Sequence, residues 1–348
     1  MKKSSLGHLI GGMLLVAGCC IGAGMLALPI LTGLSGFIPS VLALVAAWAF
    51  MTFTGFLLVE IQGWFSGRVN LLSMVEKSLG RPGRQICWAS YLFLFYALLV
   101  AYTAVSGSIL SKGFEKVQLA QLSFAEPSAA FLALPVLVIS FGFQNIIPSL
   151  ASYLHGDLRQ VRIAILGGSL LALFIYLVWT LFVLGIVPVP LIKEAYQNGQ
   201  EATLALQAVL GSSLIGVFAQ GFAFFAIVTS FLAQGLSLVH FIADGLKVAS
   251  KESRENGWLC LAAIVPPAIL AVLYPKLFFK ALNFAGGICA VILFGFLPIF
   301  MSWIGRYRKN ITSGYRVKGG KLSLLIALAF ALLVIGREIS RILGFYAT

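Results

Sequence analysis

Long apolar runs separated by short polar loops dominate the chain, and they predict helices that cross a membrane. Such a helix needs about 20 mostly apolar residues. The run 202–243 is long enough for one helix or two short ones, but only the loop after it is rich in Lys and Arg. The two flanking loops are therefore expected on opposite sides of the membrane, which requires an odd number of crossings. We predict one crossing, preceded by a surface turn near Ala202–Leu210. About nine crossings are therefore predicted, at 8–34, 40–61, 86–110, 127–153, 163–187, the later part of 202–243, 258–274, 282–303 and 322–345.

Two of the predicted helices are interrupted. In the first, Gly22-Ala-Gly24 frees the backbone from side-chain restraint, and Pro29 removes one backbone donor. Inside a membrane, such a break is tolerated only where the freed groups meet protein, water or a ligand. A half-helix beginning near Gly24 would present bare N–H groups to a carboxylate, although Gly18 and Gly22 would also suit a plain helix-packing face. The second interruption is Phe141-Gly-Phe-Gln-Asn-Ile-Ile-Pro148.

Composition and charge agree with a multi-pass membrane protein. Of 348 residues, 60% are hydrophobic and 10% are charged, whereas roughly 25% are charged in soluble domains. The net charge of +13 is explained by the distribution of Lys and Arg across the membrane, and not by nucleic-acid binding. With the N-terminus in the cytoplasm, 17 Lys and Arg fall on the cytoplasmic side and 7 outside, and an odd number of crossings leaves the C-terminus outside. The five cysteines lie in apolar segments at irregular spacing, which predicts neither disulfides nor a metal site.

Three motifs carry a resemblance to a known family. They are Gly22-Ala-Gly-Met-Leu-Ala-Leu-Pro29, Ser140-Phe-Gly-Phe143 with Ile147-Pro-Ser149, and Gly314-Tyr-Arg-Val-Lys-Gly-Gly320. In this order they resemble the hydroxy/aromatic amino-acid permeases, the bacterial tyrosine- and tryptophan-specific permeases of the amino acid/polyamine/organocation superfamily. The resemblance runs from Leu6 to the C-terminal helix. It implies a multi-pass protein of the bacterial cytoplasmic (inner) membrane.

The resemblance also implies an all-α, leucine-transporter-like fold, in which two inverted five-helix repeats precede one extra helix. We expect one transmembrane domain over 1–348, with a first repeat at 6–112, a second at 127–305 and the extra helix at 322–345. In this fold the first helix of each repeat is broken, and substrate binds between the breaks. The substrate-binding residues implied are Gly22, Ala23, Gly24, Phe141, Gly142, Phe143 and Gln144, while Tyr96 and Tyr102 could line an aromatic pocket or only pack.

The chain departs from the family pattern at two points. Family members carry two more helices before the second broken helix, but only about 17 residues, Ser111–Pro127, lie there in this chain. We therefore expect the fourth and fifth helices of the family to be missing, which leaves the downstream topology unchanged. The second departure is Gln144, where the family commonly has histidine. Glutamine can hydrogen-bond a substrate but cannot carry a proton near neutral pH.

The coupling ion implied by the resemblance is H⁺, with Na⁺ as the alternative. Ionisable residues inside a membrane are functional candidates, and here they are Glu60, His240 and Asp244. Glu60 and Asp244 lie at helix ends, where a solvated or snorkelled position is the alternative interpretation. In sodium-coupled relatives of the fold, a Thr/Ser pair on the eighth helix joins carbonyls of the first broken helix, and Thr229-Ser230 matches that pair. Hydroxyls bonded to their own i−4 carbonyls are the alternative there.

These features favour a secondary active transporter that imports tyrosine and/or tryptophan without a cofactor. Its expected partners are the free amino acid, the lipid bilayer and, as an open alternative, further copies of the chain; nucleic acid is not expected. The missing helices suggest a second possibility, a shortened relative that binds but does not transport. An enzyme is disfavoured because the sequence has no paired carboxylates, metal cluster or nucleophile–base spacing.

Overall fold

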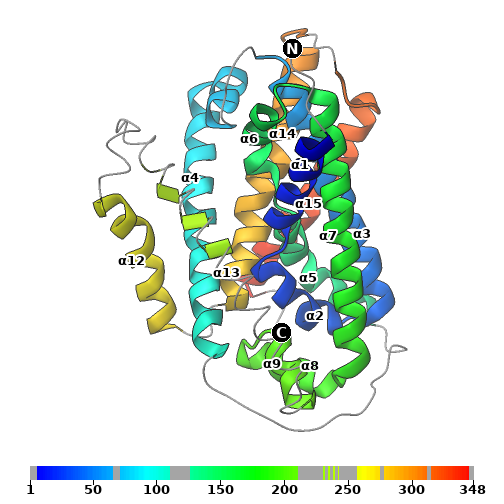
Figure 1. Cartoon of the computed structure of the whole chain (residues 1–348), viewed down its shortest axis with the longest axis vertical. Helices are drawn as coiled ribbons and strands as arrows, with labels where there is room; N and C mark the ends of the chain where they lie inside the picture. Colours follow the sequence, from blue (N-terminus) through cyan, green and yellow to red (C-terminus); the bar gives the residue numbers. More distant parts are fainter. Residues whose placement is uncertain are drawn as a thin grey trace.

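The computed structural model describes residues 6–65, 71–109, 126–210, 257–274, 278–311 and 315–344, and also residues 230, 231, 234, 235, 238, 239 and 242. Within these ranges the chain is helical and has no strand, as predicted (Figure 1). The helices are α1 (Leu6–Cys20), α2 (Ala23–Gly33), α3 (Phe37–Gln62), α4 (Leu71–Ile109), α5 (Pro127–Ser140), the 3₁₀-helix η1 (Gln144–Ile146), α6 (Ile147–Tyr153), α7 (Leu158–Ile186), α8 (Val189–Asn198), α9 (Ala202–Leu210), α12 (Gly257–Leu273), α13 (Phe278–Phe284), the π-helix η3 (Ala285–Phe296), α14 (Leu297–Tyr307) and α15 (Gly320–Ile342).

Several helical segments can cross a membrane, which makes the chain a multi-pass membrane protein. Within the part of the chain that the structure describes, five are long and apolar enough: Phe37–Gln62, Ala129–Tyr153, Leu158–Ile186, Phe278–Tyr307 and Gly320–Ile342. Leu6–Cys20 and Gly24–Gly33 would together form a sixth span, bent by 54°. The expected nine crossings stay a prediction, because residues 211–229 and most of 232–256 lie outside the described residues.

Helix α5 packs against α2, α3 and η3, and glycines allow the closest approach. A Cβ on Gly286 of η3 would lie 1.8 Å from the carbonyl oxygen of Pro135 on α5. A Cβ on the neighbouring Gly287 would lie 2.7 Å from the Cγ of Glu338 on α15. A side chain at either position would therefore force the helices apart. On the outside, α7 and α15 expose apolar side chains such as Phe174 and Ile326, as expected for faces turned to lipid.

Helix α4 begins at Leu71 rather than near Ile86, so the polar loop expected between the second and third crossings is largely helical. Gly80 has a φ of 79°, a left-handed value that favours glycine, and the helix kinks there. Glu76 and Arg84, on either side of the kink, form an ion pair at 3.0 Å. The loop prediction was wrong because the charged residues lie among apolar side chains that are buried in the first part of α4, namely Leu72, Met74 and Val75.

Two arginines near the end of α15, Arg337 and Arg341, are held by a buried acid. Both contact Glu338, whose side chain is fully buried against η3. An Arg337 nitrogen lies 3.3 Å from Glu338 Oε2, and the Nε of Arg341 lies 3.0 Å from the same oxygen. A buried carboxylate needs such partners, and the sequence alone did not show that Glu338 faces inward.

Candidate functional site

The first break lies between α1 and α2. Helix α1 ends at Cys20 and α2 begins at Ala23, so that Ile21 and Gly22 connect them. Gly22 is extended, with φ −162° and ψ −147°, and its carbonyl oxygen accepts a hydrogen bond from the Met25 N–H at 3.0 Å. The last carbonyls of α1 and the first N–H groups of α2 have no partners within their own helices. This break occurs where the sequence predicted it.

The second break lies between α5 and α6, also as predicted. Helix α5 ends at Ser140, and the short helix η1 leads into α6 at Ile147. The N–H of Gly142 donates to the carbonyl oxygen of Ile139 at 2.9 Å. A Cβ on Gly142 would lie equally close, 2.9 Å, to that same oxygen. The tight turn therefore leaves no space for a side chain at this position.

The two breaks lie against each other through Gly24 and Ser140. A Cβ on Gly24 would lie 2.2 Å from Ser140 Oγ and 3.1 Å from Ser140 Cα. Ser140 is fixed by its own hydroxyl, which donates to the carbonyl oxygen of Val136 at 2.7 Å. Gly24 itself lies inside α2. Its lack of a side chain thus serves close helix packing, rather than the irregular backbone that the sequence suggested.

Helix α7 supplies side chains that bind the breaks. The hydroxyl of Tyr176 lies 2.5 Å from the carbonyl oxygen of Cys20 and 2.9 Å from that of Ser140. One turn further on, the indole N–H of Trp179 donates to the carbonyl oxygen of Met25 at 3.0 Å. Sequence reasoning missed both residues. The available signal was two aromatic residues with polar tips, three positions apart in a mostly apolar helix.

The other predicted residues of the second break pack against α3 and α7. Gln144 is fully buried, and its amide nitrogen lies 3.0 Å from the carbonyl oxygen of Met51 and 3.3 Å from Thr54 Oγ1. This amide therefore anchors η1 on α3. Phe143 is also buried, and its ring leaves no room for a Cβ on Gly55 of α3.

The residues predicted for ion coupling are described only in part. The hydroxyl of Ser230 lies 3.4 Å from the carbonyl oxygen of Ile21, inside the first break. Thr229, His240 and Asp244 lie outside the described residues. No group of three or more His, Cys, Asp or Glu side chains that could hold a metal ion occurs within the described ranges.

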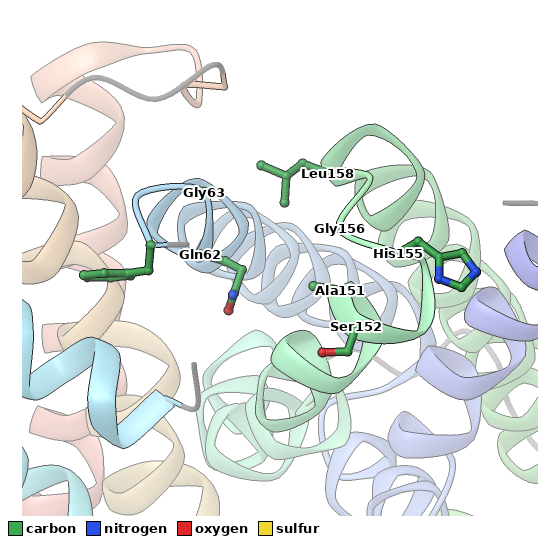
Figure 2. Close-up of a pocket in the computed structure, with 8 residues that line it drawn as sticks. Gln62, Gly63, Ala151, Ser152, His155, Gly156 and Leu158 are labelled. Atoms are coloured by element: carbon green, nitrogen blue, oxygen red, sulfur yellow. The ribbon is translucent and has the colours of Figure 1, made fainter. Parts of the chain in front are cut away.

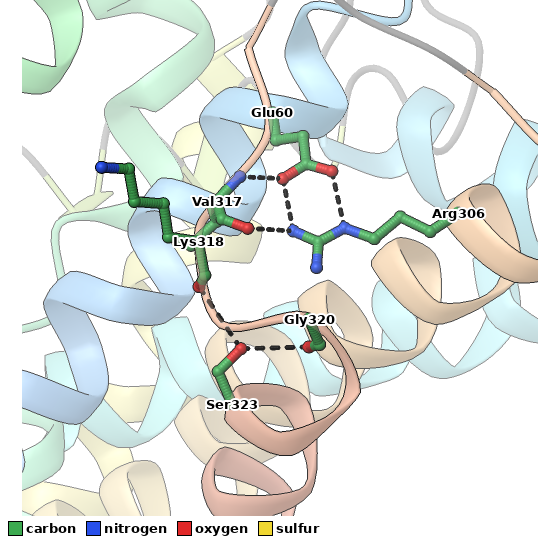
Figure 3. Close-up of polar contacts among 6 residues, drawn as sticks. All are labelled: Glu60, Arg306, Val317, Lys318, Gly320 and Ser323. Carbon is green, nitrogen blue, oxygen red and sulfur yellow. Dashed lines mark hydrogen bonds and ion pairs between the residues drawn. The ribbon is translucent and has the colours of Figure 1, made fainter.

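Glu60, which the sequence marked as a candidate proton carrier, is held in a buried ion pair (Figure 3). The Nε of Arg306 donates to Glu60 Oε1 at 2.7 Å, and the Val317 N–H donates to Oε2 at 2.7 Å. Both charged side chains are almost fully buried. Beside them, the guanidinium of Arg162 lies 3.8 Å from the ring centre of Tyr315. Tyr315 and Val317 of the 314–320 motif thus contact the ends of α3, α7 and α14.

A second buried acid, Glu201, lies between α8 and α9 and was not predicted as a site. Its carboxylate accepts hydrogen bonds from the Thr203 hydroxyl and from the N–H groups of Thr203 and Leu204, at 2.5–3.2 Å. It therefore caps the first turn of α9. Burial raises the pKa of Glu201 to about 7, although these hydrogen bonds act in the opposite direction.

A pocket of about 400 Å³ lies where α3 ends and α6 turns into α7 (Figure 2). No residue that the sequence predicted for substrate binding lines it. In Figure 2, Gln62 lies on the α3 side of the pocket, whereas Ser152 on α6 and His155 in the following turn lie on the other side. The lining residues are Gln62, Gly63, Phe65, Ala151, Ser152, His155, Gly156 and Leu158.

Comparison with known proteins identifies the family. Residues 5–132 and 115–337 match the tryptophan/tyrosine permease family. The chain is 30% identical to "Tyrosine-specific transport system 1" of Haemophilus influenzae, over 93% of this chain and 95% of that protein. It is 28% identical to the "Tryptophan-specific transport protein" of the same organism, over 98% and 97% respectively. It is 25% identical to the "Low affinity tryptophan permease" of Escherichia coli, over 93% of each chain.

These relatives are named as transport proteins and permeases, which agrees with the prediction that the chain is not an enzyme. The two family matches together cover almost the whole chain and include both helix breaks, the buried Glu60–Arg306 pair and the 314–320 motif. The chain belongs to the tryptophan/tyrosine permease family.

Proposed function

We propose that this chain is a secondary active transporter of the cytoplasmic membrane that binds tyrosine or tryptophan between its two helix breaks. The contact between the breaks at Gly24 and Ser140 carries this proposal. It brings the carbonyl ends of α1 and α5 close to the N-terminal end of α2. Carbonyl oxygens suit the ammonium group of an amino acid, and helix N–H groups suit its carboxylate. The names of the relatives point to an aromatic side chain.

Proton symport is the coupling that the family resemblance implies. Its candidate carriers are His240 and Asp244, since Glu60 is already engaged with Arg306. Sodium symport is the second candidate, and a specific observation favours it. The Ser230 hydroxyl lies beside the Ile21 carbonyl, and hard cations prefer oxygen ligands of these types.

We further infer that the chain lacks a segment that its relatives have. In the comparison with the tyrosine transport system, 93% of the 348 residues, about 324, occupy 383 aligned positions, so about 59 positions have no residue here. The two family matches meet between residues 115 and 132. About 59 residues are enough for two membrane helices with their loops. Its absence supports loss of the fourth and fifth helices.

Because both breaks remain, we expect the binding site to form. Alternating access needs one bundle of helices to rock against a scaffold. Without two helices of the first repeat, the inner gate is incomplete unless another copy of the chain completes it. We therefore expect binding of aromatic amino acids, with slow or absent uphill uptake by the monomer.

The test is binding and transport by the purified chain. Labelled tyrosine and tryptophan are measured first in detergent, with leucine as the control. Uptake is then measured in liposomes under an imposed proton gradient and, separately, a sodium gradient. Binding of neither aromatic amino acid would contradict the proposed function. Binding without uphill uptake would favour the binding-only alternative, and strong accumulation by monomers would show that the shortened chain suffices.

A further inference from the structure

Tyr176 lies in the middle of α7, and its hydroxyl meets both broken helices. The side chain is fully buried. The carbonyls that it contacts belong to Cys20 and Ser140, the last residues of α1 and α5. A single hydroxyl group therefore touches the C-terminal ends of both half-helices that precede the breaks.

The chemistry of this contact is asymmetric. A tyrosine hydroxyl has one hydrogen, so it can donate to only one of the two carbonyl oxygens at a time. Helix C-terminal ends carry partial negative charge, and two such ends brought together repel each other unless a donor lies between them. The hydroxyl satisfies one carbonyl and leaves the other with an acceptor site. An ammonium group, with three N–H donors, matches the acceptors that remain.

The neighbours of Tyr176 hold its ring in place. The ring of Phe141, the first residue after α5, meets it edge to face, with 5.2 Å between ring centres. The indole N–H of Trp179, one turn further along α7, donates a hydrogen bond to the carbonyl oxygen of Met25 in α2. Helix α7 therefore fixes the half-helices on both sides of the first break as well as the end of α5.

We propose that Tyr176 is a positioning residue that sets the distance between the carbonyl ends of α1 and α5, and so determines how tightly the ammonium group of the substrate is held. This inference rests on the proposed function and names the part of the substrate concerned. Loss of the Tyr176 hydroxyl should therefore weaken binding of the ammonium group alone. The carboxylate and the aromatic side chain of the substrate bind elsewhere in the site and do not depend on these two carbonyls.

The binding test compares Tyr176→Phe with Tyr96→Phe. Tyr96, for which the sequence left open a pocket role or simple packing, is the matched control because its hydroxyl donates to the carbonyl oxygen of Ala262 at 2.7 Å. This bond belongs to the contact between α4 and α12 and reaches neither helix break. Each protein is titrated with tyrosine and tryptophan and with their deamino analogues, 3-(4-hydroxyphenyl)propanoate and indole-3-propanoate. For Tyr176→Phe we expect the amino acids to bind roughly three- to tenfold more weakly, the effect of one hydrogen bond. The analogues should change by less than about twofold, and Tyr96→Phe should change neither.

A second measurement does not depend on substrate. Cys20 is buried at the end of α1, directly beside the tyrosine contact. In a chain whose other four cysteines are replaced by serine, the rate of Cys20 labelling by a permeant maleimide reports how often this end separates. We expect Tyr176→Phe to raise the rate roughly three- to tenfold, and Tyr96→Phe to leave it unchanged.

The outcomes separate the two proposals. Unchanged amino-acid binding and Cys20 labelling in Tyr176→Phe would overturn the role of Tyr176. Equal losses in Tyr176→Phe and Tyr96→Phe, or equal losses for amino acids and analogues, would also overturn it, because they would indicate a general effect on folding. If the unmodified chain binds no aromatic amino acid, the proposed function fails, and the Cys20 labelling rate alone then decides whether Tyr176 holds the two ends together.

Discussion

Gly24 acts through the space that it leaves and not through unusual backbone angles. The sequence identified the residue because glycines and a proline interrupt an apolar run. The reason emerges only in three dimensions, since Ser140 comes from a helix more than a hundred positions away. A sequence pattern shows that a helix is broken. It does not show which element fills the space beside the break.

This explanation predicts a pair of compensating substitutions. Gly24→Ala should lower the free energy of unfolding by about 1–3 kcal/mol, because the new methyl group overlaps the Ser140 side chain. Adding Ser140→Gly removes the overlapping atoms and should recover part of the loss. Gly24→Val should abolish substrate binding while the protein still inserts. Thermal unfolding in detergent and tyrosine binding are the measurements.

Gly18→Ala is the matched control for these substitutions, because beyond its chain neighbours and the backbone of its own helix no atom lies within 4 Å of a Cβ at that position. It should leave stability and binding nearly unchanged. If Gly24→Ala behaves like Gly18→Ala, the close contact between the breaks is not real. Tyrosine uptake by Gly24→Val at the normal rate would show that the break is not the binding site.

At the scale of elements, sequence patterns located the breaks and missed what joins them. Both interruptions were predicted from Gly and Pro. The surface turn expected near Ala202–Leu210 is instead the helix α9, and most of its side chains are buried. Tyr176 and Glu338 were not predicted, because each acts through contacts between elements distant in sequence. The apolar pattern of a membrane helix shows where the helix crosses the membrane. It does not show which side of the helix faces the other helices. A polar residue there becomes informative only when its neighbours are known.

The Glu60–Arg306 pair joins α3, α14 and the segment before α15, and this contact predicts a large loss of stability when it is broken. Glu60→Gln leaves Arg306 charged and buried, so we expect unfolding to become easier by about 3–5 kcal/mol. Replacing both residues by apolar ones, as in Glu60→Leu with Arg306→Met, should cost much less. Thermal unfolding of the purified variants measures both effects.

Glu76→Gln is the control, because its ion pair with Arg84 is about 40% exposed on both sides and should contribute at most about 1 kcal/mol. The same series tests the earlier hypothesis that Glu60 carries a coupled proton. A Glu60→Gln protein that is as stable as the unmodified chain and loses only proton-driven uptake would support the proton carrier and contradict the structural role.

At the scale of the whole molecule, the elements rich in cations lie toward one end of the bundle. Residues 306–311 and 315–320 lie at the end where α1 begins, whereas α8 and α9 lie at the opposite end (Figure 1). Lys309 contacts the carbonyl oxygens of Lys77 and Ser78, so the basic segment also meets the first part of α4. A membrane protein keeps such a cluster on the cytoplasmic side.

The last prediction follows from this distribution and concerns orientation. Lys193 on α8 and Lys318 before α15 are both exposed, and the charge bias places the first outside and the second in the cytoplasm. With the five native cysteines replaced by serine, a cysteine at 193 should react with an impermeant maleimide on intact cells. A cysteine at 318, like one at 309, should react only after the membrane is opened. Because both positions are exposed, unequal labelling reports the side of the membrane rather than burial. Reaction at 318 from outside would show that the chain has the opposite orientation, and the incomplete gate would then face the outside of the cell.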